Sequence, residues 1–253
     1  MGYDLVIRGG HAVIGGAVVA ADIAVTDGRI AALGQGFDAA ETVAAEGLLV
    51  TPGGVDPHCH IEQVSGMGLM NADTFESATR AAAMGGTTSL VSFAAQAKGQ
   101  RLSEAVADYA ARAARGAAID HAFHLLIADP GAPDFDDELR ALIAAGHRSV
   151  KLFTTYNIGL DDAAILHVLR IAGDAGALTC IHAENDAIIA EARARLLAAG
   201  RTRPVDHAAA RPRAAEIEAV ARMCRLAEVA SAPVMIFHVS TAQAVAEIAA
   251  ARA

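Results

Sequence analysis

The sequence has no tryptophan, and phenylalanine and tyrosine bring its aromatic content to only 4%. It also has only three cysteines, Cys59, Cys180 and Cys224, and their wide spacing does not form a disulfide framework. We therefore expect a reducing, cytoplasmic environment. No apolar run reaches the ~18–20 residues that a membrane span needs, so we expect no membrane partner. The apolar run 12–21 is interrupted by Gly15-Gly16, which argues against a signal peptide.

Basic residues are scarce, and lysine is the scarcest. The chain carries 20 Lys+Arg against 29 Asp+Glu, a net charge of −9, and no basic block, which argues against a nucleic-acid partner. Only Lys98 and Lys151 are lysines, so the other 18 of these 20 basic residues are arginines. Against these absences, 54% of the 253 residues are hydrophobic, which is ample for a folded core.

The first part of the chain, residues 1–51, is predicted to form a small β-rich module. Short apolar segments at 5–7, 17–19 and 23–25 are separated by glycine pairs. Asp27-Gly28 between two such segments is a strong signal for a type I′ hairpin. This module is too thin to stand alone.

From residue 52 to 253 the pattern changes to strands alternating with helices, which indicates a parallel sheet covered by helices. Predicted helices each end before a glycine, as a C-cap requires, and the first begins at a capping-box-like Asp73 and Glu76. An open doubly wound sheet and a (β/α)8 barrel both fit. The glycine-rich turn of a dinucleotide-binding sheet is absent, and polar residues follow strand after strand, which favours the barrel with six strands visible. The predicted strands are 48–55, 87–93, 122–127, 149–153, 178–182 and 234–238, and the helices are 73–84, 103–115, 136–145 and 162–175.

Four histidines occupy three of these strand ends. His58 and His60 share one face of the first strand end, and His182 and His238 each follow an apolar strand. Any one of them is more simply a structural residue, but neutral imidazoles gathered at one barrel mouth are suited to zinc. The remaining histidines lack matching positions, although His124 inside a strand is a candidate for a supporting role.

Lys151 lies within the apolar strand 149–153, where a charged ammonium is disfavoured. It could extend from a barrel rim or pair with an acid, yet arginine holds nearly every other basic position. A buried amine can lose its proton and add carbon dioxide, whereas a guanidinium cannot. Together with the four histidines, Lys151 is a candidate for a carbamate that bridges two metal ions. Lys98 is interpreted as a solvated loop residue.

With these residues assembled, the sequence resembles the hydantoinase/dihydropyrimidinase family of cyclic amidohydrolases over its whole length. The His-x-His pair alone marks only the broad amidohydrolase group, and the later segments are more specific. The segments that carry the resemblance are PGGVDPHCH at 52–60, AMGGTT at 83–88, SVKLFTTY at 149–156, IHAEN at 181–185, HAAARPRAAEIEA at 207–219 and FHVS at 237–240.

The resemblance implies a metal-dependent (β/α)8 barrel flanked by a small β-sandwich, with two zinc ions bridged by a carboxylated lysine that requires CO2. His58 and His60 would hold the first metal, His182 and His238 the second, and Lys151 would bridge them. Tyr156 would hydrogen-bond the substrate carbonyl. In this family two further barrel strands follow, and the last carries an aspartate ligand. The chain therefore resembles an N-terminal half, and Met1–Ala253 alone is expected to be poorly folded and inactive.

The implied activity of the complete enzyme is hydrolysis of hydantoins or dihydropyrimidines to N-carbamoyl amino acids, in a homo-oligomer, either a tetramer or a dimer. Two alternatives remain open: another cyclic amidohydrolase of the allantoinase or dihydroorotase type, and a non-catalytic oligomeric scaffold. The loop 62–71 is either an apolar wall for a substrate substituent or simple packing.

Overall fold

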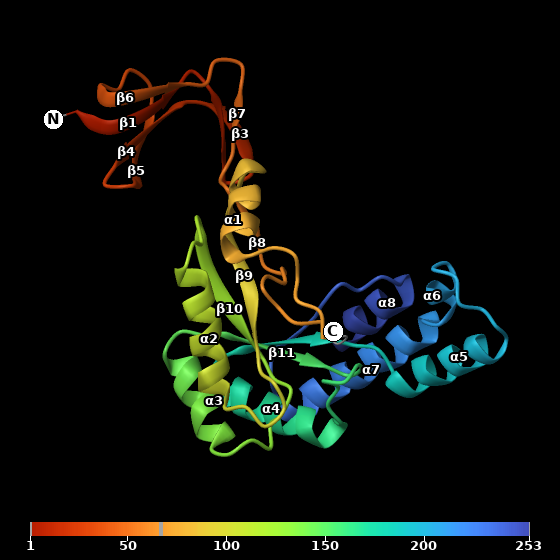
Figure 1. Ribbon diagram of the computed structural model, residues 1–253. Coiled ribbons are helices and arrows are strands. Elements are labelled where there is room, and N and C mark those ends of the chain that lie inside the picture. The colour runs from red at the N-terminus through yellow and green to blue at the C-terminus, as the bar shows by residue number, and fades with distance from the viewer. Residues whose placement is uncertain (1, 66–67, 253) are drawn as a thin grey trace. The chain divides into compact units, whose positions relative to one another are not determined.

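The computed structural model describes residues 2–65 and 68–252, and it divides into two compact units, Met1–Gly54 and Val55–Ala253 (Figure 1). Each unit is described by itself. None of the helices in the described part of the chain is long and apolar enough to cross a membrane.

The first unit consists of two small β-sheets. Four strands pair in the order β5-β4-β1-β6, and three pair in the order β3-β2-β7. The hairpin between β4 and β5 turns at Asp27 and Gly28, whose φ angles of 51° and 70° are those of the predicted type I′ turn. The strands are β1 (Tyr3–Arg8), β2 (His11–Ile14), β3 (Ala17–Ala20), β4 (Asp22–Thr26), β5 (Arg29–Gly34), β6 (Ala39–Ala44) and β7 (Leu49–Val50).

The second unit is a six-stranded sheet covered by helices. Its strand order is β13-β12-β11-β10-β9-β8, and the four pairings from β9 to β13 are parallel. The sheet curls so strongly that its two edges approach each other. The ring of His58, after the edge strand β8, lies 5.3 Å from that of His238, after the opposite edge strand β13. The strands are β8 (Gly54–Asp56), β9 (Thr87–Ala95), β10 (Asp120–Leu126), β11 (Ser149–Phe153), β12 (Leu178–His182) and β13 (Val234–Ile236).

Helices follow the strands in alternation, as the sequence predicted. They are α1 (Phe75–Met84), α2 (Leu102–Ala114), α3 (Phe135–Ala144), α4 (Asp162–Asp174), α5 (Asp186–Ala198), α6 (Asp206–Ala209), α7 (Arg213–Ala230) and α8 (Ala242–Ala251).

The two faces of the curled sheet bury different side chains. In β11, Val150 and Leu152 join the large core beneath the helices, whereas Lys151 and Phe153 point to the inner face. A smaller cluster lines that inner face: Phe93, Leu126, Phe153, Cys180 and Phe237. Burying each large apolar side chain contributes ~1.5–3 kcal/mol, so both faces stabilise the sheet. The inner face is the one from which a site at the strand ends can be built.

Three predicted boundaries need correction, and most of the others shift by one or two residues. The strand predicted at 48–55 is two strands, β7 and β8, because Pro52 lies between them and lacks the N–H that a continuous ladder needs. Helix α1 begins after Thr74, which forms its capping box with Ser77, so Asp73 and Glu76 are not the capping pair. The strand predicted at 234–238 ends at Ile236.

The four predicted glycines all end their helices: Gly85 is the C-cap residue of α1, and Gly116, Gly146 and Gly176 directly follow the C-caps of α2, α3 and α4. Gly146 and Gly176 follow α3 and α4 with φ of 115° and 74°. After α1, Gly86 rather than Gly85 has the positive φ. At position 116 the requirement for glycine is steric and does not come from the backbone angle, because a Cβ there would lie 2.9 Å from the side chain of Glu76.

Candidate metal centre

The five predicted metal ligands come together at the carboxyl ends of β8, β11, β12 and β13. The imidazole rings of His58 and His60 lie 5.4 Å apart, and those of His182 and His238 lie 4.7 Å apart. The ring of His58 is also 5.3 Å from that of His238, which connects the two pairs. The two histidines of each predicted pair are therefore neighbours in space, although His182 and His238 are 56 residues apart in the sequence.

Lys151 is the most unusual side chain of the second unit. It is completely buried, and its Nζ has no hydrogen-bond partner within the described residues. The amine instead faces aromatic rings, with Nζ 4.1 Å from the ring centre of Phe237 and 4.8 Å from that of Phe153. Desolvation by burial lowers the pKa of Lys151 to about 7.

An unpartnered buried amine is costly unless something absent from the protein chain satisfies it. A neutral amine at this position can add carbon dioxide, and the two oxygens of the resulting carbamate are suited to bridging two cations. The chemistry of the donor set therefore fits a two-metal centre.

Three of the histidines at this site favour the neutral form, which is the form that binds metals. Burial, followed by the nearby Lys151, lowers the pKa of His58 to about 4. Burial, followed by His182, lowers the pKa of His238 to about 4. Burial also lowers the pKa of His60. The lone pairs of these three rings are thus available near neutral pH.

Within residues 2–65 and 68–252, no three His, Cys, Asp or Glu side chains are grouped closely enough to hold one metal ion. The predicted site does not require such a group. Each metal would take two histidines, and the third ligand shared by both would be the modified Lys151, which is not one of those four residue types.

Glu184 orients His182. Its Oε2 lies 2.7 Å from His182 Nε2. A carboxylate oxygen accepts a hydrogen bond, so the N–H of His182 is on Nε2 and the lone pair is on Nδ1. Arg211 forms an ion pair with the same carboxylate. Burial raises the pKa of Glu184, but the hydrogen bonds from His182 and Arg211 outweigh it, and the pKa stays below its usual value. Glu184 lies in the IHAEN segment at 181–185, but no sequence pattern predicted a role for its carboxylate.

Tyr156 lies beside this histidine. Its ring is 5.2 Å from that of His182, and the guanidinium of Arg211 lies 5.1 Å from the ring centre of Tyr156. The side chain is about half exposed, and its backbone has a φ of 69°. Partial burial, opposed by Arg211, raises the pKa of Tyr156, so the phenol keeps its proton and can donate a hydrogen bond.

His124 has a supporting place in the same unit. Its Nε2 lies 2.8 Å from the carbonyl oxygen of Pro57, and its Nδ1 lies 2.7 Å from Ser149 Oγ. A carbonyl oxygen can only accept a hydrogen bond, so the N–H of His124 is on Nε2. This hydrogen bond to Pro57 holds the segment just before His58. Both nitrogens are used, so His124 is not free to bind a metal.

Two further predictions concern neighbouring side chains. Cys59 points away from His58 and His60, with its Sγ 3.8 Å from the carbonyl oxygen of Val91. In the loop 62–71, Val64 forms a bridge with Met70, and Val64, Leu69 and Met70 are at least half exposed. Met67, which the sequence placed in the same apolar wall, lies outside the described residues.

Comparison with known proteins agrees with this arrangement. Residues 49–250 match the amidohydrolase family. The chain is 39% identical to a D-hydantoinase of Rhizobium radiobacter over 99% of its own length and 55% of that enzyme. A D-hydantoinase of Streptomyces coelicolor is 40% identical over all of this chain and 56% of that enzyme.

Solved structures are equally similar. A D-hydantoinase structure superposes with a TM-score of 0.95 at 38% identity, covering 98% of this chain and 55% of that one. A dihydropyrimidinase from Brevibacillus agri gives a TM-score of 0.93 at 38% identity, covering 98% and 54%. The chain spans about half the length of the curated relatives it matches. With a matching family model, these relatives and a curled parallel sheet carrying histidines at its strand ends, the chain belongs to the amidohydrolase family.

Proposed function

We propose that the protein containing this chain hydrolyses the cyclic amide bond of hydantoins or dihydropyrimidines and releases N-carbamoyl amino acids. The observation that carries the proposal is the buried, unpartnered Nζ of Lys151 among four histidines at the strand ends. Its support from comparison is that relatives at 38–40% identity are named hydantoinases and dihydropyrimidinases.

The cofactor in this proposal is a pair of zinc ions in an eight-stranded barrel. His58 and His60 would hold one ion, His182 and His238 would hold the other, and carboxylated Lys151 would be the ligand that both share. The carbamate forms when the neutral amine of Lys151 adds CO2 and releases one proton. When bound, the two ions polarise the substrate carbonyl and lower the pKa of water, so that a nucleophile is available at neutral pH.

The side chains of this chain then orient the reactants. Water adds across the ring C–N bond: the carbonyl carbon gains a hydroxyl group, and the released ring nitrogen gains a proton. The Tyr156 hydroxyl donates a hydrogen bond to the carbonyl oxygen as negative charge develops on it. Arg211 contacts both Tyr156 and Glu184, so one cation holds the phenol and the support of His182 in the same place.

We further propose a cytoplasmic homo-oligomer, a dimer or a tetramer, that acts on a small molecule rather than on nucleic acid or membranes. The net charge of −9 supports the exclusion of nucleic acid, because phosphate backbones attract basic surfaces.

The purified complete protein that contains this chain should open 5-substituted hydantoins and dihydrouracil, and removal of metal should stop the reaction. The measurement follows N-carbamoyl product by chromatography, with both enantiomers of each hydantoin, before and after treatment with a chelator and after addition of zinc and bicarbonate. Allantoin and dihydroorotate serve as comparison substrates. Faster turnover of either one would favour the alternative amidohydrolase class, and no turnover of any ring would favour the scaffold.

A further inference from the structure

Gln63 forms a direct contact with one of the proposed metal ligands. Its side-chain Oε1 lies 2.7 Å from His60 Nδ1. An amide oxygen has no proton to donate, so the proton of this hydrogen bond belongs to His60 Nδ1. The lone pair of the neutral ring is therefore on Nε2, the nitrogen on the other side of the ring.

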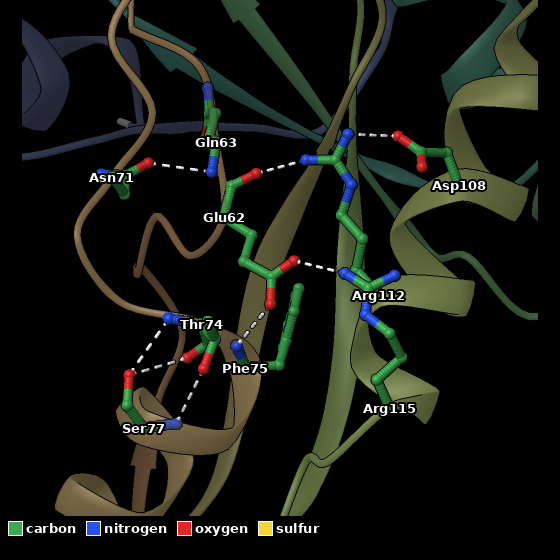
Figure 2. A network of polar contacts seen from close by, with 9 residues as sticks. All are labelled: Glu62, Gln63, Asn71, Thr74, Phe75, Ser77, Asp108, Arg112 and Arg115. Carbon is green, nitrogen blue, oxygen red and sulfur yellow. Dashed lines mark hydrogen bonds and ion pairs between the residues drawn. The ribbon is translucent and has the colours of Figure 1, made fainter.

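The backbone of Gln63 is fixed by a neighbouring residue across the loop. Its N–H donates to Asn71 Oδ1 at 2.9 Å (Figure 2), and the Asn71 N–H donates to the Gln63 carbonyl oxygen at 3.0 Å. Two bonds in opposite directions restrict both the position and the rotation of this peptide. The side chain that reaches His60 therefore starts from a fixed backbone.

Glu62, the preceding residue, ties the same segment to two helices. Its carboxylate accepts from the N–H of Phe75 at the start of α1 at 2.9 Å, and it pairs with Arg115 at 2.8 Å (Figure 2). Its carbonyl oxygen accepts from Arg112 of α2, which is itself paired with Asp108. The carboxylate side chain is only 13% exposed.

The backbone of Glu62 needs this support. Its φ of 45° is in the left-handed region, which is unfavourable for a residue with a side chain. Contacts from α1 and α2 to both its side chain and its carbonyl hold it there. The turn that follows His60 is thus set by the helices and is not left to the loop.

We infer that Gln63 is a positioning residue that presents Nε2 of His60 to the metal, and that Glu62, through Arg112 and Arg115, holds Gln63 in place. The inference rests on the proposed function, since it assumes that His60 binds metal. Metal-binding histidines generally donate their second N–H to a fixed acceptor, and loss of such an acceptor typically weakens metal binding ~10–100-fold. Gln63 lies outside every segment that carries the family resemblance, so nothing but its contact assigns this role.

The test measures zinc affinity of the complete protein by competition with a chromophoric chelator. Gln63→Leu keeps the size of the side chain but removes the acceptor, and we expect zinc affinity to fall ~10–100-fold. Gln63→Glu keeps an acceptor oxygen and should retain affinity close to the wild-type value. Ser77→Ala is the matched control: it removes the α1 capping pair beside this network without touching Gln63, so it should lower the thermal midpoint but not zinc affinity.

A second measurement needs no metal. In metal-free protein labelled with 15N-histidine, long-range proton–nitrogen spectra report which nitrogen of His60 carries the proton, with His60→Asn providing the assignment. We expect the Nδ1–H form in the wild type and a mixture of tautomers in Gln63→Leu. If the wild type binds no zinc, the proposed function fails, and the spectra alone decide on Gln63. Unchanged zinc affinity together with an unchanged His60 tautomer in Gln63→Leu would overturn the inference.

Discussion

Lys151→Arg should abolish ring opening although it leaves the net charge unchanged. A guanidinium stays protonated and cannot add CO2, so the bridging ligand is lost. The charge stabilisation that a metal centre provides is worth several kcal/mol, so we expect kcat to fall on the order of a thousandfold or more. Zinc content should fall with it. Steady-state kinetics on a 5-substituted hydantoin and metal analysis of the same preparation give the two values.

The chain offers a matched control for this substitution. Lys98 is the only other lysine, and it is exposed in a loop of the same unit, so Lys98→Arg should leave turnover and zinc content unchanged. Lys151→Ala opens space beside the metals, and short carboxylic acids added to it should restore part of the activity by replacing the carbamate. Near-normal turnover by Lys151→Arg would show that the buried amine has only a structural role.

Tyr156→Phe should lower kcat by about 100- to 1,000-fold, the effect of removing one hydrogen-bond donor from a developing oxyanion. Because Tyr156 would contact the substrate carbonyl in the proposed mechanism and would not bind metal, zinc content should stay at the wild-type value. This separation of kcat from metal content distinguishes Tyr156 from Lys151. The measurement is kcat and KM on the same hydantoin, with zinc counted in each sample.

Tyr109→Phe is the control for loss of a phenol. Tyr109 is buried in α2, where Arg112 lies 4.6 Å from its ring centre. Tyr109 has no part in the proposed reaction. Its phenylalanine variant should keep kcat. If Tyr156→Phe keeps its kcat as well, then the oxyanion is stabilised by other groups and the proposed role of Tyr156 is wrong.

The sequence was sufficient to find the strand ends, because their signal is local. Apolar runs such as 149–153 and 178–182 agree with β11 and β12 at both boundaries, and a polar residue at or after each run is then placed by the geometry of a parallel sheet. The meeting of His182 and His238 follows from this geometry alone. The N-terminal hairpin was equally predictable, since two residues with positive φ leave few alternatives to Asp-Gly.

The supporting contacts were not predictable in the same way. Gln63 reaches His60, and Arg211 reaches Glu184, through loops whose course depends on helices elsewhere in the chain. Nothing in the spacing of Arg112 and Arg115 indicates that they hold a turn about 50 residues earlier. The left-handed backbone of Glu62 and Tyr156 has no local signal either, because neither residue type favours it.

The boundary of the first strand shows the limit of pattern reading. The segment 48–55 was predicted to be one strand, but Pro52 breaks its ladder and leaves two short strands in different sheets. The proposed metal ligands His58 and His60 follow β8, where His124 contacts the carbonyl oxygen of Pro57 and Gln63 contacts His60. Tertiary contacts thus support the chain at the place where the strand is short.

The most direct test of the two-metal account is the zinc content of the complete wild-type protein that contains this chain, purified with zinc and bicarbonate and without chelator, then measured by elemental analysis against protein concentration. Four histidines in two pairs and one shared lysine predict close to two zinc ions per chain. Only trace amounts of divalent metal in folded protein would contradict the account.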